Sequence, residues 1–377
     1  MIEIPLSAPD ITEDDLAAVT AVLRTPQLSR GPQVEQFESA MASYIGVPHA
    51  IAVSSGTAAL HLALLALGIG LGDEVIVPSF AFVAVASAVL YVGARPVFAD
   101  VGAESLNLSP DAVEAAITLR TRAIIAVHTF GRPADLPALL DIAQRHSLML
   151  IEDACEAIGA EIGGRRVGSF GDAAVFGFYP NKQITTGEGG MVVTLHGEAA
   201  NRMRALRNHG RYEAHASGAD AGSAWPDHVE LGYNYRLTEM QAALGLAQLG
   251  RIDSILAGRE AIARRYAELL GGDENLQLPA VDIPGQRMSW FVFVVRLIQT
   301  GRDGVMRALA DAGIATGRYF APIHLQPAYS AWRDPKPLAN AEFAATRTLA
   351  LPFFSRITDD QICRVCAALR ESLRAAA

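Results

Sequence analysis

One of the two lysines in this chain lies where its amine can do chemistry. Only Lys182 and Lys336 occur among 31 basic residues, and Lys182 precedes the glycine-rich turn 187–190. Arginine stays protonated in proteins, whereas a lysine amine can lose its proton and form a Schiff base. No G-x-x-x-x-G-K pattern precedes Lys182, so it is not a nucleotide-loop lysine. The alternative, a solvated loop lysine, is weakened by the chain's preference for arginine.

Two further groups of polar residues follow predicted strands. Ser55, Gly56 and Thr57 come between a strand and a helix, where free backbone N–H groups suit a phosphate, although an ordinary serine-capped turn is the alternative. Glu152 and Asp153 end an apolar run, where a carboxylate can pair with a cationic ring nitrogen or a metal, or cap a turn. Ligands of open α/β sheets bind at the carboxyl ends of the strands, so these groups are candidates for one site.

A fourth segment, residues 231–243, opens an amphipathic helix. Its apolar side indicates a core or interface helix, but the polar Asn234 just ahead of the helix is harder to explain by packing. His61 and His128 are interpreted as structural.

The elements that position these residues alternate between short β-rich runs and helical patterns, which predicts a largely parallel sheet covered by helices on both faces. The predicted strands are residues 50–53, 74–77, 96–99, 123–127, 148–151, 173–178 and 191–194. The predicted helices between them are residues 57–67, 81–91, 111–117 and 135–146.

The pattern changes after about residue 250. A long amphipathic helix at 251–270 is followed by a polar stretch, a strand at 290–297 and helices at 303–312 and 358–373. We therefore expect a large domain, residues 1–250, and a smaller C-terminal α+β domain, residues 251–377.

Composition excludes several classes of protein. The chain has 377 residues, of which 51% are hydrophobic and 19% charged, which is typical of a globular protein. The net charge of −9 argues against a nucleic-acid partner. No signal peptide or membrane span is expected, because the longest apolar stretches are shorter than the roughly 20 residues that a span needs. Three cysteines make no disulfide framework. A cytoplasmic protein without a membrane partner is expected.

The ordered motifs resemble one family, the DegT/DnrJ/StrS group of sugar aminotransferases that depend on pyridoxal 5′-phosphate (PLP). The resemblance covers nearly the whole chain. It rests on residues 28–34 (L-S-R-G-P-Q-V), 53–60 (V-S-S-G-T-A-A-L), 72–82 (G-D-E-V-I-V-P-S-F-A-F), 152–160, 182–194, 206–210 (L-R-N-H-G) and 232–239 (G-Y-N-Y-R-L-T-E). It implies the fold type I of PLP-dependent transferases, which is that of aspartate aminotransferase.

The resemblance also implies roles for single residues. Lys182 resembles the lysine that holds PLP as a Schiff base, and Asp153 the aspartate that keeps the pyridine nitrogen protonated. Ser55, Gly56 and Thr57 resemble the phosphate cradle.

Other implied roles concern the faces of the cofactor and the substrate. Phe82 falls where the family places an aromatic ring against the cofactor. Asn234 resembles a residue that reaches the phosphate from the partner subunit, which implies a homodimer with shared sites. Tyr179, His209 and His324 resemble residues that face the substrate.

Two positions depart from the family pattern. Gly177 stands where many members have a phosphate-binding serine, so we expect Asn181 or backbone N–H groups to replace it. Glu156 stands where Gln or His usually lies near the ring hydroxyl. Its carboxylate either repels the carboxylate of the amino donor or is protonated.

The resemblance implies transfer of an amino group, with L-glutamate as the expected donor, to a nucleotide-linked keto sugar for amino sugar biosynthesis. The alternatives are an aminotransferase for an aminocyclitol ketone and a non-catalytic PLP-fold regulator. Relatives that replace the lysine with histidine catalyse deoxygenation, which the intact Lys182 disfavours.

Overall fold

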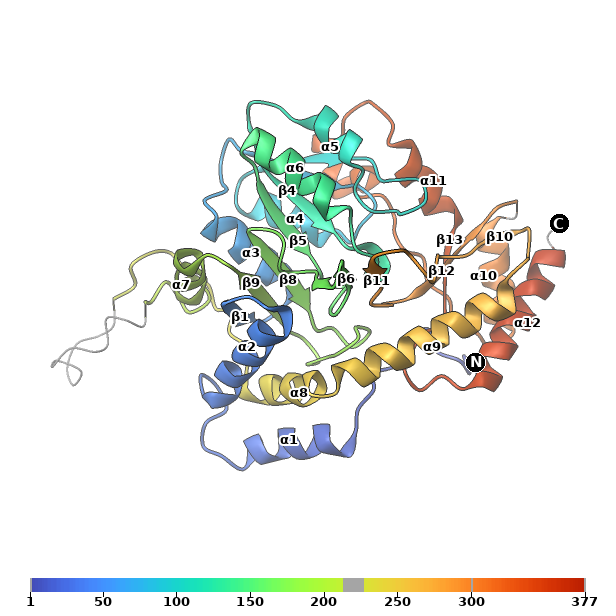
Figure 1. The fold of residues 1–377 in the computed structure, drawn as a ribbon, viewed down its shortest axis with the longest axis horizontal. Coiled ribbons are helices and arrows are strands. Elements are labelled where there is room, and N and C mark those ends of the chain that lie inside the picture. The colour runs from blue at the N-terminus through green and yellow to red at the C-terminus, as the bar shows by residue number, and fades with distance from the viewer. Residues whose placement is uncertain (1, 213–226, 300, 376–377) are drawn as a thin grey trace.

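A seven-stranded sheet forms the centre of the fold in the computed structural model, which describes residues 2–212, 227–299 and 301–375 (Figure 1). The strand order is β1-β9-β8-β5-β4-β2-β3. Strands β3, β2, β4, β5 and β8 run parallel, while β9 is antiparallel to both β8 and β1. The predicted, largely parallel sheet is confirmed. Its strands are β1 (His49–Val53), β2 (Glu74–Pro78), β3 (Arg95–Ala99), β4 (Thr121–Val127), β5 (Met149–Asp153), β8 (Ala173–Gly177) and β9 (Gly190–Thr194).

Helices cover both faces of this sheet because alternate residues of a buried strand point to opposite sides. In β4, Ile124 and Ala126 pack into one hydrophobic cluster, while Ile125 and Val127 pack into another. The first cluster includes residues of α2 (Pro32–Ile45), α6 (Leu136–His146) and α8 (Glu239–Leu249). The second includes residues of α3 (Gly56–Ala66), α4 (Ala84–Tyr91) and α7 (Gly197–Leu206). The remaining helices of this part are α1 (Glu13–Leu23) and α5 (Pro110–Ala116).

A smaller sheet with the order β10-β12-β13 lies in the C-terminal part of the chain. Its strands are β10 (Leu276–Gln277), β12 (Phe293–Leu297) and β13 (Thr348–Leu351), and helices α9 (Ile252–Leu270), α10 (Arg302–Asp311), α11 (Ala339–Arg347) and α12 (Asp359–Ala375) accompany it. A third, short ribbon joins β11 (Gln286–Arg287) to the hairpin of β6 (Glu161–Ile162) and β7 (Arg165–Arg166). Ile4 also packs into the C-terminal core, so the N-terminal segment contributes to a unit that we expected to begin at residue 251.

Two predicted element boundaries were wrong, one at helix α4 and one at strand β12. Helix α4 begins at Ala84, three residues later than predicted, and in the segment before it Phe80 is buried while Phe82 is exposed. Strand β12 begins at Phe293, so Trp290 and Phe291 lie outside the strand. Both differences place aromatic residues in irregular segments. The directions of their side chains are therefore not set by the repeat of a helix or a strand.

Gly171 gives a test of how tightly β5 and β8 are joined. A Cβ atom at this position would lie 2.5 Å from the backbone oxygen of Leu150, so Gly171→Ala is expected to lower the free energy of unfolding by about 1–3 kcal/mol. Gly258→Ala is the matched control, because a Cβ in this turn of α9 meets nothing within 4 Å. The control should stabilise the protein by about 0.5–1 kcal/mol. Urea unfolding measures both, and equal stability of Gly171→Ala and the wild type would contradict the packing.

Candidate active site

A cavity of about 520 Å³ lies at the carboxyl ends of β1, β5 and β8, which is within the usual size of ligand sites. Most of the residues singled out from the sequence line it, although they come from segments far apart in the chain. These are Ser55, Gly56, Thr57, Phe82, Asp153, Glu156, Gly177, Tyr179, Asn181 and Lys182.

The amine of Lys182 rests between a carboxylate and an aromatic ring. Its Nζ lies 3.6 Å from Oε1 of Glu156 and 3.9 Å from the ring centroid of Phe291. The side chain is only 15% exposed, so both contacts act in a largely dry environment. Phe291 comes from the C-terminal part of the chain, and the amine is therefore held from both parts of the molecule.

Glu156 is buried, and its Oε2 accepts a hydrogen bond of 2.8 Å from the N–H of Phe130. Burial raises the pKa of this carboxyl above its ordinary value, while Lys182 and the Phe130 N–H act in the opposite direction. The protonation of Glu156 therefore depends on whether a positive charge, such as the Lys182 ammonium, lies beside it.

Asp153 is the last residue of β5 and lines the cavity. Its Oδ1 accepts the N–H of Cys155 at 3.1 Å, and its backbone oxygen accepts the N–H of His128 at 3.1 Å. The carboxylate is thus fixed at the strand end, with its side chain at the cavity wall.

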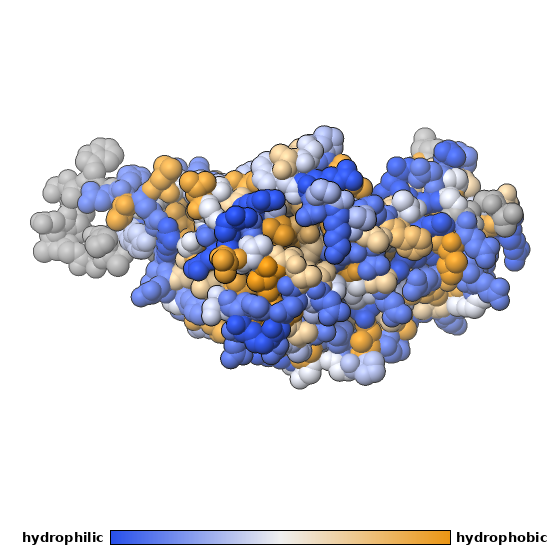
Figure 2. Space-filling view, turned by 90° about the horizontal axis from the view of Figure 1, so that it is seen from above, coloured by the Kyte–Doolittle hydropathy of each residue, from blue (hydrophilic) through white to orange (hydrophobic). Residues whose placement is uncertain are grey.

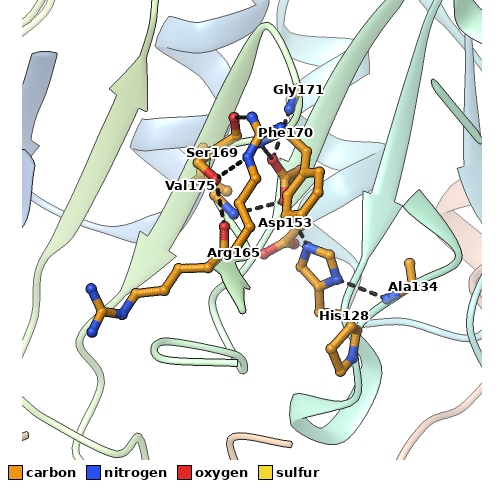
Figure 3. Close-up of polar contacts among 12 residues, drawn as sticks. His128, Ala134, Asp153, Arg165, Ser169, Phe170, Gly171 and Val175 are labelled. Atoms are coloured by element: carbon orange, nitrogen blue, oxygen red, sulfur yellow. Dashed lines mark hydrogen bonds and ion pairs between the residues drawn. The ribbon is translucent and has the colours of Figure 1, made fainter. Parts of the chain in front are cut away.

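The neighbouring Glu152 is fully buried away from solvent and does not line the cavity. Its two oxygens accept backbone N–H groups from Gly168 at 2.7 Å and from Phe170 and Gly171 at 2.8 Å (Figure 3). Burial raises the pKa of Glu152, but hydrogen bonds from His128 and these backbone groups outweigh it, and the pKa is lowered overall. Glu152 is therefore a structural anion.

His128 completes this arrangement as a neutral ring. Its Nδ1 accepts the N–H of Ala134 at 3.0 Å, so this nitrogen carries no proton (Figure 3). Its Nε2, 3.2 Å from Glu152, then donates. The ring links β4 to β5 just below Asp153, which agrees with the structural role predicted for His128.

The turn before α3 lies against Gly177, and together they form a cradle of backbone groups for an anion. Ser55 caps α3, and its Oγ accepts the N–H of Ala58 at 3.1 Å. A Cβ atom at Gly56 would lie 3.0 Å from Sγ of Cys155, and one at Gly177 would lie 3.2 Å from the same sulfur. The thiol therefore fills the space that a larger residue at 177 would need. The N-terminus of α3 remains open to an anion.

Other features of the cavity indicate a missing group. The side-chain oxygen of Asn181 is buried and has no hydrogen-bond partner among the residues that the structure describes. Phe82 and Tyr179 are large aromatic residues, yet they are 62% and 53% exposed. Unpaired polar atoms and exposed aromatic rings in a cavity are typical of a ligand site.

The PLP group implied by the sequence fits these residues. Lys182 would hold its aldehyde carbon, Asp153 its ring nitrogen, and the Ser55–Gly56–Thr57 turn its phosphate. When bound, PLP supplies an electron sink for bonds at the carbon that carries the amine.

His324 does not line the cavity of its own chain, and its expected role toward the substrate stays a prediction. The ring is 2% exposed, with Nδ1 2.5 Å from Oγ of Ser79 and Nε2 3.2 Å from Glu342. Both nitrogens are occupied by these contacts, so His324 ties its loop to the end of β2.

His209 and Asn234 also lie outside the cavity of their own chain. The N–H of His209 donates to the oxygen of Tyr233 at 2.9 Å, and Asn234 pairs with Asn208 as an isolated bridge. Asn234 is exposed. Neither residue contacts the groups around Lys182 within one chain.

Several lining residues were missed by the sequence reasoning. They are Phe291, Tyr319 and Phe320 from the C-terminal part, together with Cys155 and Glu188 near the recognised motifs. The C-terminal aromatic residues carry no local motif, and their aromatic character alone was the available signal.

The fold and the cavity define a PLP-dependent α/β transferase, and comparison with known proteins identifies the family. The model of the DegT/DnrJ/EryC1/StrS aminotransferase family matches residues 9–370, and the chain belongs to this family. It is therefore a PLP-dependent aminotransferase.

Individual relatives match along their whole length. GDP-perosamine synthase of Caulobacter vibrioides is 42% identical, with 98% of each chain covered. A UDP-N-acetyl-3-dehydro-alpha-D-glucosamine 3-aminotransferase of Acidithiobacillus ferrooxidans is 40% identical, covering 99% of this chain and 97% of that protein. The structure of the putative sugar aminotransferase Spr1654 from Streptococcus pneumoniae, in its PMP-form, has 28% identity, a TM-score of 0.94 and 100% coverage of both chains.

Two other features concern the described ranges as a whole. None of their helices combines the length and apolar character that crossing a membrane requires. No group of three or more His, Cys, Asp or Glu side chains in these ranges forms a potential metal site.

Glu152→Gln tests whether the buried carboxylate organises the site. An amide would turn one NH₂ group toward donors such as the N–H of Gly168 or Nε2 of His128, so we expect a loss of about 3 kcal/mol or more in the free energy of unfolding. Glu114→Gln is the matched control, because Glu114 pairs with Arg145 at the surface, where an ion pair contributes little to the free energy of unfolding. Urea unfolding compares them, and a cost for Glu152→Gln no larger than the control's would contradict this role.

Proposed function

We propose that this enzyme transfers the amino group of L-glutamate to the keto group of a nucleotide-linked sugar. The observation that carries the proposal is the position of the Lys182 amine, which faces Glu156 in a cavity that also contains the Asp153 carboxylate and the anion cradle. Two relatives of at least 40% identity are named for nucleotide-linked amino sugars, which supports this substrate class. The cavity of about 520 Å³ leaves room for a sugar beside the cofactor.

The proposed roles follow from the positions of the side chains. Lys182 would hold the cofactor, and its amine would move a proton at the donor carbon as a general base. Asp153 pairs with the ring nitrogen and keeps its proton in place. Gly56 and Thr57 bind the phosphate through the open turn of α3, and Asn181 contributes its buried side chain.

Glu156 is proposed to lie at the ring hydroxyl in its neutral form. Because burial raises its pKa, the neutral form is favoured once the Lys182 ammonium is no longer beside it. A neutral Glu156 donates a hydrogen bond and does not repel the carboxylate of glutamate. This resolves the conflict that an acidic residue at this position presents.

The sugar is proposed to enter through the aromatic mouth of the cavity. Phe82 and Tyr179 are exposed there, and Tyr319 and Phe320 line the wall on the C-terminal side. Aromatic faces suit the apolar faces of sugar rings and of a nucleotide base.

We also propose a cytoplasmic homodimer whose partners share their sites. Asn234 is exposed and away from its own cavity, and the adjacent Leu231 and Val229 are 87% and 60% exposed. Figure 2 shows hydrophobic residues on the surface at the left of the molecule, the side on which Figure 1 places α7. Exposed apolar residues of this kind are typical of surfaces that another chain covers.

The reaction is tested with ¹⁵N-glutamate and a panel of nucleotide-linked keto sugars, using mass spectrometry to detect labelled amino sugars. We expect a labelled product from at least one nucleotide sugar. Lys182→Arg keeps the positive charge but cannot form a Schiff base, so its turnover should fall by at least about a hundredfold. Amination of free aminocyclitol ketones without any nucleotide sugar would overturn the substrate proposal, and turnover by Lys182→Arg would overturn the role of the lysine.

Mixed dimers test whether the sites are shared. Asn234→Ala should weaken PLP binding by about tenfold, because it removes a hydrogen bond to a charged group. Co-expression with Lys182→Arg chains should restore one normal site per mixed dimer, since that site takes Lys182 from one chain and Asn234 from the other. Asp153→Asn chains mixed with Lys182→Arg chains are the control, because both residues belong to one chain's cavity and no normal site forms. The absence of high-affinity PLP binding in the first mixture would contradict shared sites.

A further inference from the structure

A second cavity, of about 170 Å³, lies between the large sheet and β12. It shares no lining residue with the active-site cavity. The residues that determine its chemistry are Leu106, Phe130, Arg132, Trp290, Val292 and Arg296.

Two guanidinium groups line this cavity without a matching set of carboxylates. The guanidinium of Arg132 makes no hydrogen bond or ion pair with any residue that the structure describes, and the hydrogen bonds of Arg132 are made by its backbone. The guanidinium of Arg296 donates to the backbone oxygens of Ala103 and Glu104, at 2.5 and 3.2 Å. Burial lowers the pKa of both arginines, and Glu104 at the rim opposes this from beyond ion-pair distance. Two half-buried cations beside the single carboxylate of Glu104 leave an excess of positive charge, which favours an anionic ligand.

Several other residues of the cavity wall are apolar. Phe130, Trp290 and Val292 are all at least nine-tenths buried, and Leu106 lies on the same wall. A protein cavity of about 150 Å³ with an apolar lining accepts benzene, so this one has room for a single ring or a short branched chain. The combination selects a ligand with an apolar body and one negative end.

We propose that this cavity binds a small organic carboxylate with an apolar body, with the carboxylate at Arg132 and Arg296. Two segments connect this cavity to the groups around Lys182. Phe130 lines it and also donates its N–H to Glu156, while Trp290 lines it and precedes the Phe291 ring that contacts the Lys182 amine. The bound carboxylate therefore adjoins the environment of Lys182 without entering the cofactor cavity.

The test uses benzoate as the probe and benzamide as its neutral analogue, with binding to the PLP-loaded enzyme measured by isothermal titration calorimetry. We expect one benzoate per chain and weaker binding of benzamide. Arg132→Gln should weaken benzoate binding by at least about tenfold, because a hydrogen bond to a charged group is lost. Arg132→Lys keeps the charge and should retain most of the affinity.

Arg307→Gln is the matched control, since it removes one positive charge from an exposed position on α10 and should leave the affinity unchanged. Glutamate, which binds at the active site, should not displace benzoate. Equal affinities of the wild type and Arg132→Gln, displacement by glutamate, or no binding by the wild type would each overturn the proposal. Because the measurement needs no sugar substrate, its outcome is independent of the identity of that substrate.

Discussion

The buried carboxylate of Glu152 is the constraint on which the rest of the site depends. Three backbone N–H groups and the neutral ring of His128 satisfy its oxygens, and these donors come from the residue after β4 and from the segment before β8. Because consecutive strand residues point to opposite faces, fixing Glu152 inside the core directs Asp153 into the cavity. The loss of any one donor would leave a buried charge partly unsatisfied, which is costly. The position of the Asp153 carboxylate is therefore set by packing beneath the site.

The amine of Lys182 depends on a second set of contacts that joins the two parts of the chain. Glu156 is held by the N–H of Phe130, and Phe291 from the C-terminal part covers the amine. The backbone oxygens of Trp290 and Phe291 accept hydrogen bonds from the buried guanidinium of Arg259 at 2.7 and 2.8 Å. The aromatic wall of the site is thereby anchored to α9. This connection explains how residues far from the lysine in sequence are held at contact distance from it.

The sequence predicted the lining residues of the cavity well where a motif lies in the turn or loop that follows a strand. Asp153 ends β5, the Ser55–Thr57 turn follows β1, and Lys182 lies in the loop after β8. Their place in the cavity follows from the order of these elements. Phe291, Tyr319 and Phe320 were not predictable, because their positions depend on how the smaller sheet packs against the larger one. The surroundings of His324 were not predictable for a related reason, since only the fold reveals that Ser79 and Glu342 enclose it. The sequence analysis treated Glu152 and Asp153 as one candidate pair. The alternation of side chains along β5 already places them on opposite faces, with Glu152 in the core and Asp153 at the cavity.

Borohydride reduction of the PLP-loaded enzyme, followed by peptide mass spectrometry, tests the central claim most directly. Reduction makes the bond between the cofactor and an amine permanent, so the modified peptide identifies the attachment point. The account predicts that the added mass is found on the peptide containing Lys182 and not on the peptide containing Lys336. A modification at Lys336, or none in protein saturated with PLP, would contradict it.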